Sequence, residues 1–151
     1  MFILVVDNNK FFVSVLQSML YHAGFDNIES AANGIECLLK ANRKDSPEVI
    51  IIDENFCFVE GSDILNNIRL SLPETRIIIL TEADSDLDIT HLPDDGYIFF
   101  MEKHRISAEN LPQVLYSIFT EKISANKLPP VNKVFSSLRR SFTGMLNMLL
   151  F

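Results

Sequence analysis

The sequence predicts an α/β protein built on a doubly wound, five-stranded parallel sheet. Short apolar runs rich in Val, Ile and Phe alternate with amphipathic helical patterns along the chain. The run at residues 49–52 is apolar at four successive positions, which is typical of a strand buried on both faces of a parallel sheet. Several of these runs end abruptly in polar residues, so we expect those residues to gather at the carboxyl edge of the sheet.

The five expected strands are short apolar segments that end in polar residues or turns. The first ends at Asp7, the third at Asp53 and the fourth at Thr81. Their expected ranges are residues 2–6, 28–31, 49–53, 76–81 and 97–101.

The expected helices carry apolar residues at intervals of three or four. The first covers residues 10–23 and is closed by Gly24, and the second runs from residue 35 to near residue 45. Asn55 and Gly61 predict a turn or loop before a third helix that begins at Ser62 and stops before Pro73. A last helix spans residues 111–119. Residues 82–96 are acidic and lack an apolar period, so at most a short or irregular helix is expected there.

The chain is expected to divide into a domain over residues 1–122, a linker over 123–130 and an amphipathic C-terminal helix over 131–151. The linker ends in two prolines, which favour a new helix start. The apolar residues that follow have heptad spacing: Val131, Phe135, Leu138, Phe142, Met145 and Leu149. Such a helix should not persist alone in water.

Three surfaces could receive the C-terminal helix: a second copy of itself, the preceding domain of its own or a neighbouring chain, or an anionic membrane. Its basic residues and lack of acids fit a membrane surface, but the heptad seam favours protein contact. Self-association through residues 131–151 is therefore the first expectation, and membrane binding the last.

Composition narrows the function. The net charge is −7, and all 20 acidic residues lie at or before Glu121, which argues against direct nucleic-acid binding by the whole protein. Cys37 and Cys57 lack metal-ligand spacing and read as reduced core or loop residues. The N-terminus has no basic region before its apolar run and meets Asp7 early, unlike a signal peptide, so a cytoplasmic protein is expected.

The polar groups at the expected sheet edge suggest phosphoryl chemistry. Two carboxylates, on Asp7 and Asp53, would converge there with the Thr81 hydroxyl, and Lys103 just past the fifth strand could reach the same place. Mg²⁺ prefers such oxygen ligands, and phosphoryl transfer needs little beyond a nucleophile, the metal and a cation. The chain has no glycine-rich nucleotide motif and no Ser- or Cys-based catalytic grouping, so an enzyme is not expected.

Four segments together resemble the receiver domain of bacterial two-component response regulators, of the type seen in the chemotaxis regulator. They are ILVVDNN, VIIIDENFCFVEG, IIILTEA and YIFFMEK, and the resemblance covers about residues 2–122. It implies a flavodoxin-like fold of the receiver type, a bound Mg²⁺ and a role in phosphorelay signalling.

The resemblance also implies roles for individual residues. Asp53 would be the phosphoacceptor, Thr81 would hydrogen-bond the phosphoryl group and Lys103 would pair with its charge. Tyr97 or Phe99 would be the aromatic that changes rotamer as Thr81 moves. The implied Mg²⁺ ligands are Asp7, Asn8, Asp53 and the backbone carbonyl of Asn55.

Four features depart from the family pattern. Asn8 stands where a second acid is usual, Cys57 replaces a proline, and Glu82 follows Thr81 in place of a small residue. Lys103 lies six residues past Tyr97, where three is usual, so either the fifth strand is extended or Phe99 or Phe100 takes the aromatic position.

Two functions are therefore considered, and the first is favoured over the second. The first is a response regulator that accepts a phosphoryl group on Asp53 from a histidine kinase or phosphotransfer protein and then changes its affinity for a partner. The alternative is a pseudo-receiver, a phosphorylation-independent interaction module, which Asn8 and Glu82 favour.

Overall fold

A computed structural model describes residues 1–59, 62–88 and 96–120 of the chain. The expected linker over 123–130 and the expected helix over 131–151 lie outside these residues, as does Gly61.

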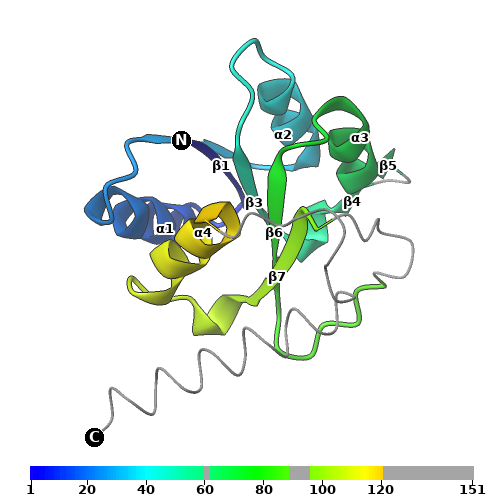
Figure 1. Ribbon diagram of the computed structural model, residues 1–151. Helices are drawn as coiled ribbons and strands as arrows, with labels where there is room; N and C mark the ends of the chain where they lie inside the picture. Colours follow the sequence, from blue (N-terminus) through cyan, green and yellow to red (C-terminus); the bar gives the residue numbers. More distant parts are fainter. Residues whose placement is uncertain (60–61, 89–95, 121–151) are drawn as a thin grey trace, which may run out of the picture.

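The core of the protein is a parallel sheet of five strands in the order β2-β1-β3-β6-β7 (Figure 1). The strands are β1 (Phe2–Val6), β2 (Asn27–Ala31), β3 (Val49–Asp53), β6 (Arg76–Thr81) and β7 (Ile98–Glu102). All four strand pairs are parallel. The doubly wound sheet predicted from the sequence is confirmed. The first and last residues of each strand lie within one residue of the expected positions.

Within the described residues, helices cover both faces of this sheet (Figure 1). Helices α1 (Lys10–His22) and α4 (Asn110–Thr120) pack on one face, and α2 (Gly34–Ala41) and α3 (Ile64–Ser71) on the other. Asn9 caps α1, since its side chain accepts the Phe12 N–H, and Gly24 ends the following turn with φ +92°. The cap matters for the site because it fixes the chain directly after Asp7.

The central strands alternate their side chains between two apolar layers. Ile50 and Ile52 of β3 join the layer under α2 and α3, whereas Ile51 joins the layer under α1 and α4. Strands β1 and β6 alternate in the same way. Both faces are therefore buried, which explains why these strands read as continuous apolar runs.

Two helix boundaries and one connecting segment differ from the sequence-based prediction. Helix α2 ends at Ala41, short of residue 45, because Asn42 caps it and a loop follows. Helix α3 begins at Ile64, two residues later than expected, since the Asp63 side chain accepts the Asn66 N–H as its N-cap. Ahead of it, β4 (Phe58–Val59) and β5 (Ser62–Asp63) form a small antiparallel pair where only a loop was expected.

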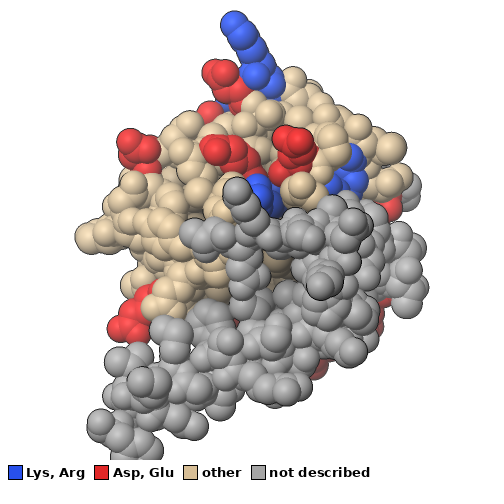
Figure 2. Space-filling model, in the orientation of Figure 1, with Lys and Arg blue, Asp and Glu red and all other residues tan. Residues whose placement is uncertain are grey.

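Residues 82–88 contain no helix or strand, in keeping with the irregular connection expected before β7. No helix in the described ranges is long and apolar enough to cross a membrane. Figure 2 shows one face of the molecule, on which Lys and Arg side chains are interspersed with Asp and Glu and form no continuous basic patch.

Cys37 and Cys57 are both free thiols buried completely in the layer under α2 and α3. Burial raises the pKa of the Cys37 thiol to about 12 and also raises the pKa of Cys57, where Asp53 and Glu54 add to the effect. The thiolate is the reactive form, so both residues should be inert in the folded protein. This agrees with the core role expected from the sequence.

We predict that neither cysteine reacts with a thiol-specific chromogenic reagent at pH 7.5 in the native protein. Both should react promptly after unfolding in guanidinium chloride, because unfolding removes the burial that raises their pKa values. Prompt labelling of one thiol in the native state would contradict this assignment.

Candidate functional site

The site lies at the carboxyl edge of the sheet, where three strands end in charged residues. Asp7 follows β1, Asp53 is the last residue of β3, and Lys103 follows β7. Val6 pairs with Ile52, and Asp53 pairs with Leu80 of β6, so the register holds these strand ends level with one another. The sequence-based expectation that these residues converge is met by the geometry.

Lys103 bridges the two carboxylates. Its Nζ lies 2.7 Å from Oδ2 of Asp53, to which it donates a hydrogen bond, and 2.7 Å from Oδ2 of Asp7. Both acids are almost fully buried, with exposed fractions of 5% for Asp7 and 3% for Asp53. The ammonium also lies 4.6 Å from the centre of the Phe12 ring, which provides a cation–π contact from α1.

The charge state of Lys103 follows from these contacts. Burial alone would lower the pKa of its ammonium, but the hydrogen bond to Asp53 and the charges of Asp53 and Asp7 outweigh burial and raise it. A pKa raised by folding means that this stabilisation is complete below the ordinary lysine pKa of about 10.4. It is lost only as the pH rises through the folded-state value, so Lys103 is charged at neutral pH.

Asp53 is held from its other side by the turn that follows it. The backbone N–H and the side-chain Nδ2 of Asn55 both donate to Asp53 Oδ1, at 2.9 and 2.8 Å. A 3₁₀ turn, η1 (Glu54–Phe56), creates this geometry by folding Asn55 back toward the strand end. The carboxylate is therefore fixed between Asn55 and Lys103, with a defined orientation.

The donor set fits a magnesium ion. Oδ2 of Asp7 is a buried oxygen that makes no hydrogen bond, although Lys103 Nζ neutralises it at 2.7 Å, and Oδ1 accepts the Asn9 N–H. No group of three or more His, Cys, Asp or Glu that could hold a metal occurs in the described parts of the chain. Mg²⁺ commonly uses one or two carboxylates and completes its octahedron with water and phosphate oxygens, so this pair suffices.

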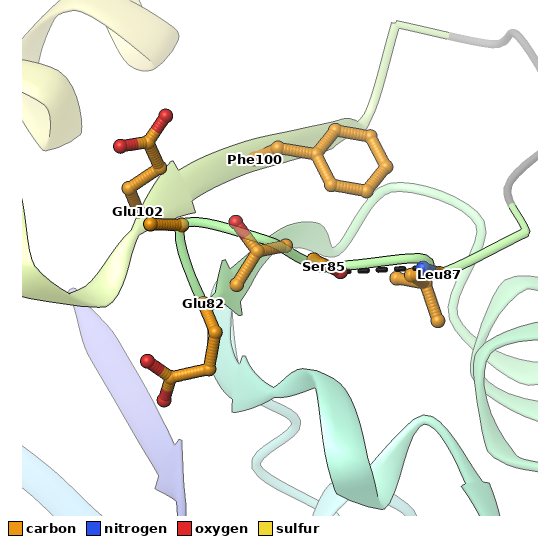
Figure 3. A pocket seen from close by; sticks show the side chains of 7 residues that line it. Glu82, Ser85, Leu87, Phe100 and Glu102 are labelled. Atoms are coloured by element: carbon orange, nitrogen blue, oxygen red, sulfur yellow. Dashed lines mark hydrogen bonds between the residues drawn. The ribbon is translucent and has the colours of Figure 1, made fainter.

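Thr81 borders a small pocket, whose lining does not include Asp7, Asp53 or Lys103. The hollow, of about 240 Å³, lies between the chain that follows β6 and strand β7 (Figure 3). Glu82, Ser85 and Leu87 come from the first side, and Phe100 and Glu102 from β7. The pocket leaves room next to Thr81 for side-chain rearrangement.

The aromatic beside Thr81 is Phe100, which the sequence analysis left open as an alternative to Tyr97 and Phe99. The carbonyl of Tyr97 accepts the N–H of Ile77, near the start of β6, four residues and about 13 Å along the strand from Thr81. Its ring stacks instead near the guanidinium groups of Arg69 and Arg76. Phe99 points to the opposite layer, under α1 and α4. Phe100 stands three residues before Lys103, the spacing that made it an alternative in the sequence analysis.

The structure reveals a further contact that sequence reasoning missed. The Glu54 side chain accepts the backbone N–H of Glu82 at 3.0 Å through Oε1 and the hydroxyl of Ser85 through Oε2. These residues lie 28 and 31 positions from Glu54. Asn8, by contrast, is exposed beside Asp7, and its side chain is not among the groups that contact Lys103.

The carboxyl edge of this parallel sheet thus carries two carboxylates bridged by a lysine. The family model for the response regulator receiver domain matches residues 3–116. The chain belongs to this family, as its sequence motifs indicated.

Curated relatives share this region. The alkaline phosphatase synthesis transcriptional regulatory protein of Bacillus subtilis is 33% identical over 86 residues, which cover 57% of this chain and 35% of that protein. The nitrate/nitrite response regulator homologue of Haemophilus influenzae is 37% identical over 75 residues, 48% of this chain and 34% of that protein. The matched region spans about a third of each relative.

Solved structures agree on the fold. A chemotaxis protein of Vibrio cholerae superposes with a TM-score of 0.64 at 27% identity, covering 77% of this chain and 96% of that one. A response regulator receiver domain from Clostridium thermocellum gives a TM-score of 0.64 at 26% identity, covering 80% and 94%.

We predict that Asn8→Asp tightens Mg²⁺ binding by about tenfold or more, measured by isothermal titration calorimetry. Two charges 4 Å apart interact by roughly 4 kcal/mol at an effective dielectric of 20, so a second carboxylate next to Asp7 should strengthen the site. The matched control is Asn9→Asp, which adds the same charge one residue later and preserves the α1 cap. Equal changes in the two variants would show that position 8 is not a ligand position.

Proposed function

We propose that this protein is a response regulator whose receiver domain accepts a phosphoryl group on Asp53. The observation that carries the proposal is the position of the Asp53 carboxylate, buried at the sheet edge and fixed by Asn55 on one oxygen and Lys103 on the other. A carboxylate bound in this way has a set orientation, and phosphoryl transfer depends mainly on such positioning.

In the proposed reaction, an Asp53 oxygen forms a bond to the phosphorus of a phosphohistidine. The bond from phosphorus to the imidazole nitrogen breaks, and the imidazole leaves with the electron pair. Lys103 lies where its positive charge can neutralise the phosphoryl oxygens. Asp7, Asn8, Asp53 and the carbonyl of Asn55 would hold Mg²⁺, which supplies charge neutralisation at the phosphoryl group when bound.

The output of this reaction is a changed surface. Thr81 stands at the end of β6 with the 240 Å³ pocket beside it, and Phe100 lines the same pocket. Movement of Thr81 toward the new phosphoryl oxygens would open space into which Phe100 can turn, which alters the surface formed by β6, β7 and α4. The protein then acts through partner affinity, as a signalling domain that would catalyse its own phosphoryl transfer and dephosphorylation.

The partners in this proposal are a histidine kinase or phosphotransfer protein as donor and a protein target as receiver of the signal, in the cytoplasm. The domain would comprise residues 1–122, followed by the linker over 123–130. Residues 131–151 would provide self-association. The Bacillus subtilis relative is named a transcriptional regulatory protein, but this chain matches only 35% of its length. With a net charge of −7, direct nucleic-acid binding is not part of the proposal.

We predict that acetyl phosphate with Mg²⁺ adds one phosphoryl group to the wild-type protein, measured by intact-mass spectrometry. Asp53→Asn should add none, because an amide does not replace the carboxylate as nucleophile. Asp45→Asn, an exposed aspartate in the loop after α2, is the matched control and should label like the wild type. Absence of labelling in every protein would favour the pseudo-receiver, and labelling of Asp53→Asn would move the phosphoacceptor elsewhere.

A further inference from the structure

The Glu54 carboxylate joins the turn that holds the phosphoacceptor to the chain that follows Thr81. Glu54 directly follows Asp53, and its two oxygens accept the Glu82 N–H and the Ser85 hydroxyl. The amide of Glu82 belongs to the same peptide unit as the carbonyl of Thr81. Holding this N–H therefore holds the backbone on which the Thr81 side chain depends.

The segment over residues 82–87, which we term the switch loop, is organised around these two bonds. Ser85 Oγ, which donates to Glu54, also accepts the N–H of Leu87 at 3.3 Å (Figure 3). The Ser85 N–H donates to the carbonyl of Glu82 at 3.3 Å, which closes a turn. One carboxylate thus fixes the start and the middle of the loop that walls the pocket beside Thr81.

Apart from its two hydrogen bonds, the Glu54 carboxylate lies in unfavourable electrostatic surroundings, because its neighbours are acidic. The switch loop carries three acids, Glu82, Asp84 and Asp86, all exposed, and Glu54 follows the buried acid Asp53. Like charges repel, so the Glu82 N–H and the Ser85 hydroxyl hold the Glu54 carboxylate against the repulsion of the neighbouring acids. A further negative charge near Glu54 would shift this balance.

We propose that Glu54 is a latch that holds the switch loop, and with it Thr81, in the resting position, and that phosphorylation of Asp53 releases it by charge repulsion. The release rests on the proposed function, whereas the latch itself does not. An acyl phosphate carries about two negative charges where the free carboxylate carries one. The added charge arises one residue from Glu54, so it weakens the latch at the moment when Thr81 must move.

Hydrogen exchange of the unphosphorylated full-length protein tests the latch. Glu54→Ala should speed exchange of the Glu82 amide by about tenfold or more, because its N–H loses a charged acceptor. The Leu87 amide should exchange faster too, since the Ser85 hydroxyl that accepts its N–H loses its own bond to Glu54. Asp84→Asn removes one charge from the same loop without touching the latch, and should change exchange less than about twofold. Amides of β1 and β3 report whether each variant remains folded.

Two further variants separate the parts of the latch. Ser85→Ala should speed exchange at Leu87 more than at Glu82, since only the Leu87 N–H bonds to Ser85 Oγ. Glu54→Gln keeps an oxygen that accepts the Glu82 N–H but has no charge. In the unphosphorylated variant, the exchange rate of the Glu82 amide should therefore stay within about threefold of the wild-type rate. Exchange in Glu54→Ala that matches Asp84→Asn would overturn the latch.

The release is tested on the same proteins under acetyl phosphate and Mg²⁺, with labelling followed by mass. In the labelled wild type, exchange at Glu82 should rise by about tenfold, whereas labelled Glu54→Gln should change far less because it has no charge to repel. Equal responses of the two labelled proteins would overturn release by repulsion. If no protein is labelled, the proposed function and the release both fail, while the unphosphorylated comparison still decides the latch.

Discussion

The contact of one ammonium group with two buried carboxylates constrains how the strands of this protein align. Lys103 Nζ lies 2.7 Å from an oxygen of both Asp7 and Asp53, which come from strands that are neighbours in the sheet. Two desolvated acids this close would repel each other strongly if Lys103 were absent. The ends of β1, β3 and β7 must therefore stay level, and the parallel register with its two buried faces provides that alignment.

Much of this arrangement was predictable from the sequence, because a short β-branched run that ends in an acid indicates a buried strand whose end lies at the edge of the sheet. The positions of Asp7 and Asp53 followed directly from where the apolar runs stop. The sequence left the aromatic beside Thr81 open among Tyr97, Phe99 and Phe100, because all three lie in one aromatic run. Only the pairing of Ile77 with Ile98 fixes which ring faces the pocket. A shift of one residue sends a side chain to the opposite face, as it does for Phe99.

The contact of Glu54 with the switch loop was beyond prediction for a different reason. It joins residues 28 positions apart, and an acid next to an acidic loop reads as a solvated charge. Its partners are a backbone N–H and a hydroxyl, which leave no charge pattern in the sequence. The boundaries of α2 and α3 were missed similarly, because Asn42 and Asp63 act as caps through local geometry. The fold and the charged residues at the sheet edge can be predicted from the apolar periodicity and from where the apolar runs end. Helix caps and loop contacts cannot, because they depend on which residues the folded chain brings together.

The most direct test of the central contact is the free energy of unfolding of Lys103→Met at pH 7, measured by urea denaturation with and without Mg²⁺. Loss of the ammonium leaves two buried carboxylates unneutralised, so we expect a loss of roughly 3 kcal/mol in chelator and partial recovery in saturating Mg²⁺. Lys44→Met, which removes an exposed lysine in the loop after α2, should stay within about 0.5 kcal/mol of the wild type. A Lys103→Met protein as stable as the wild type in chelator would contradict the account.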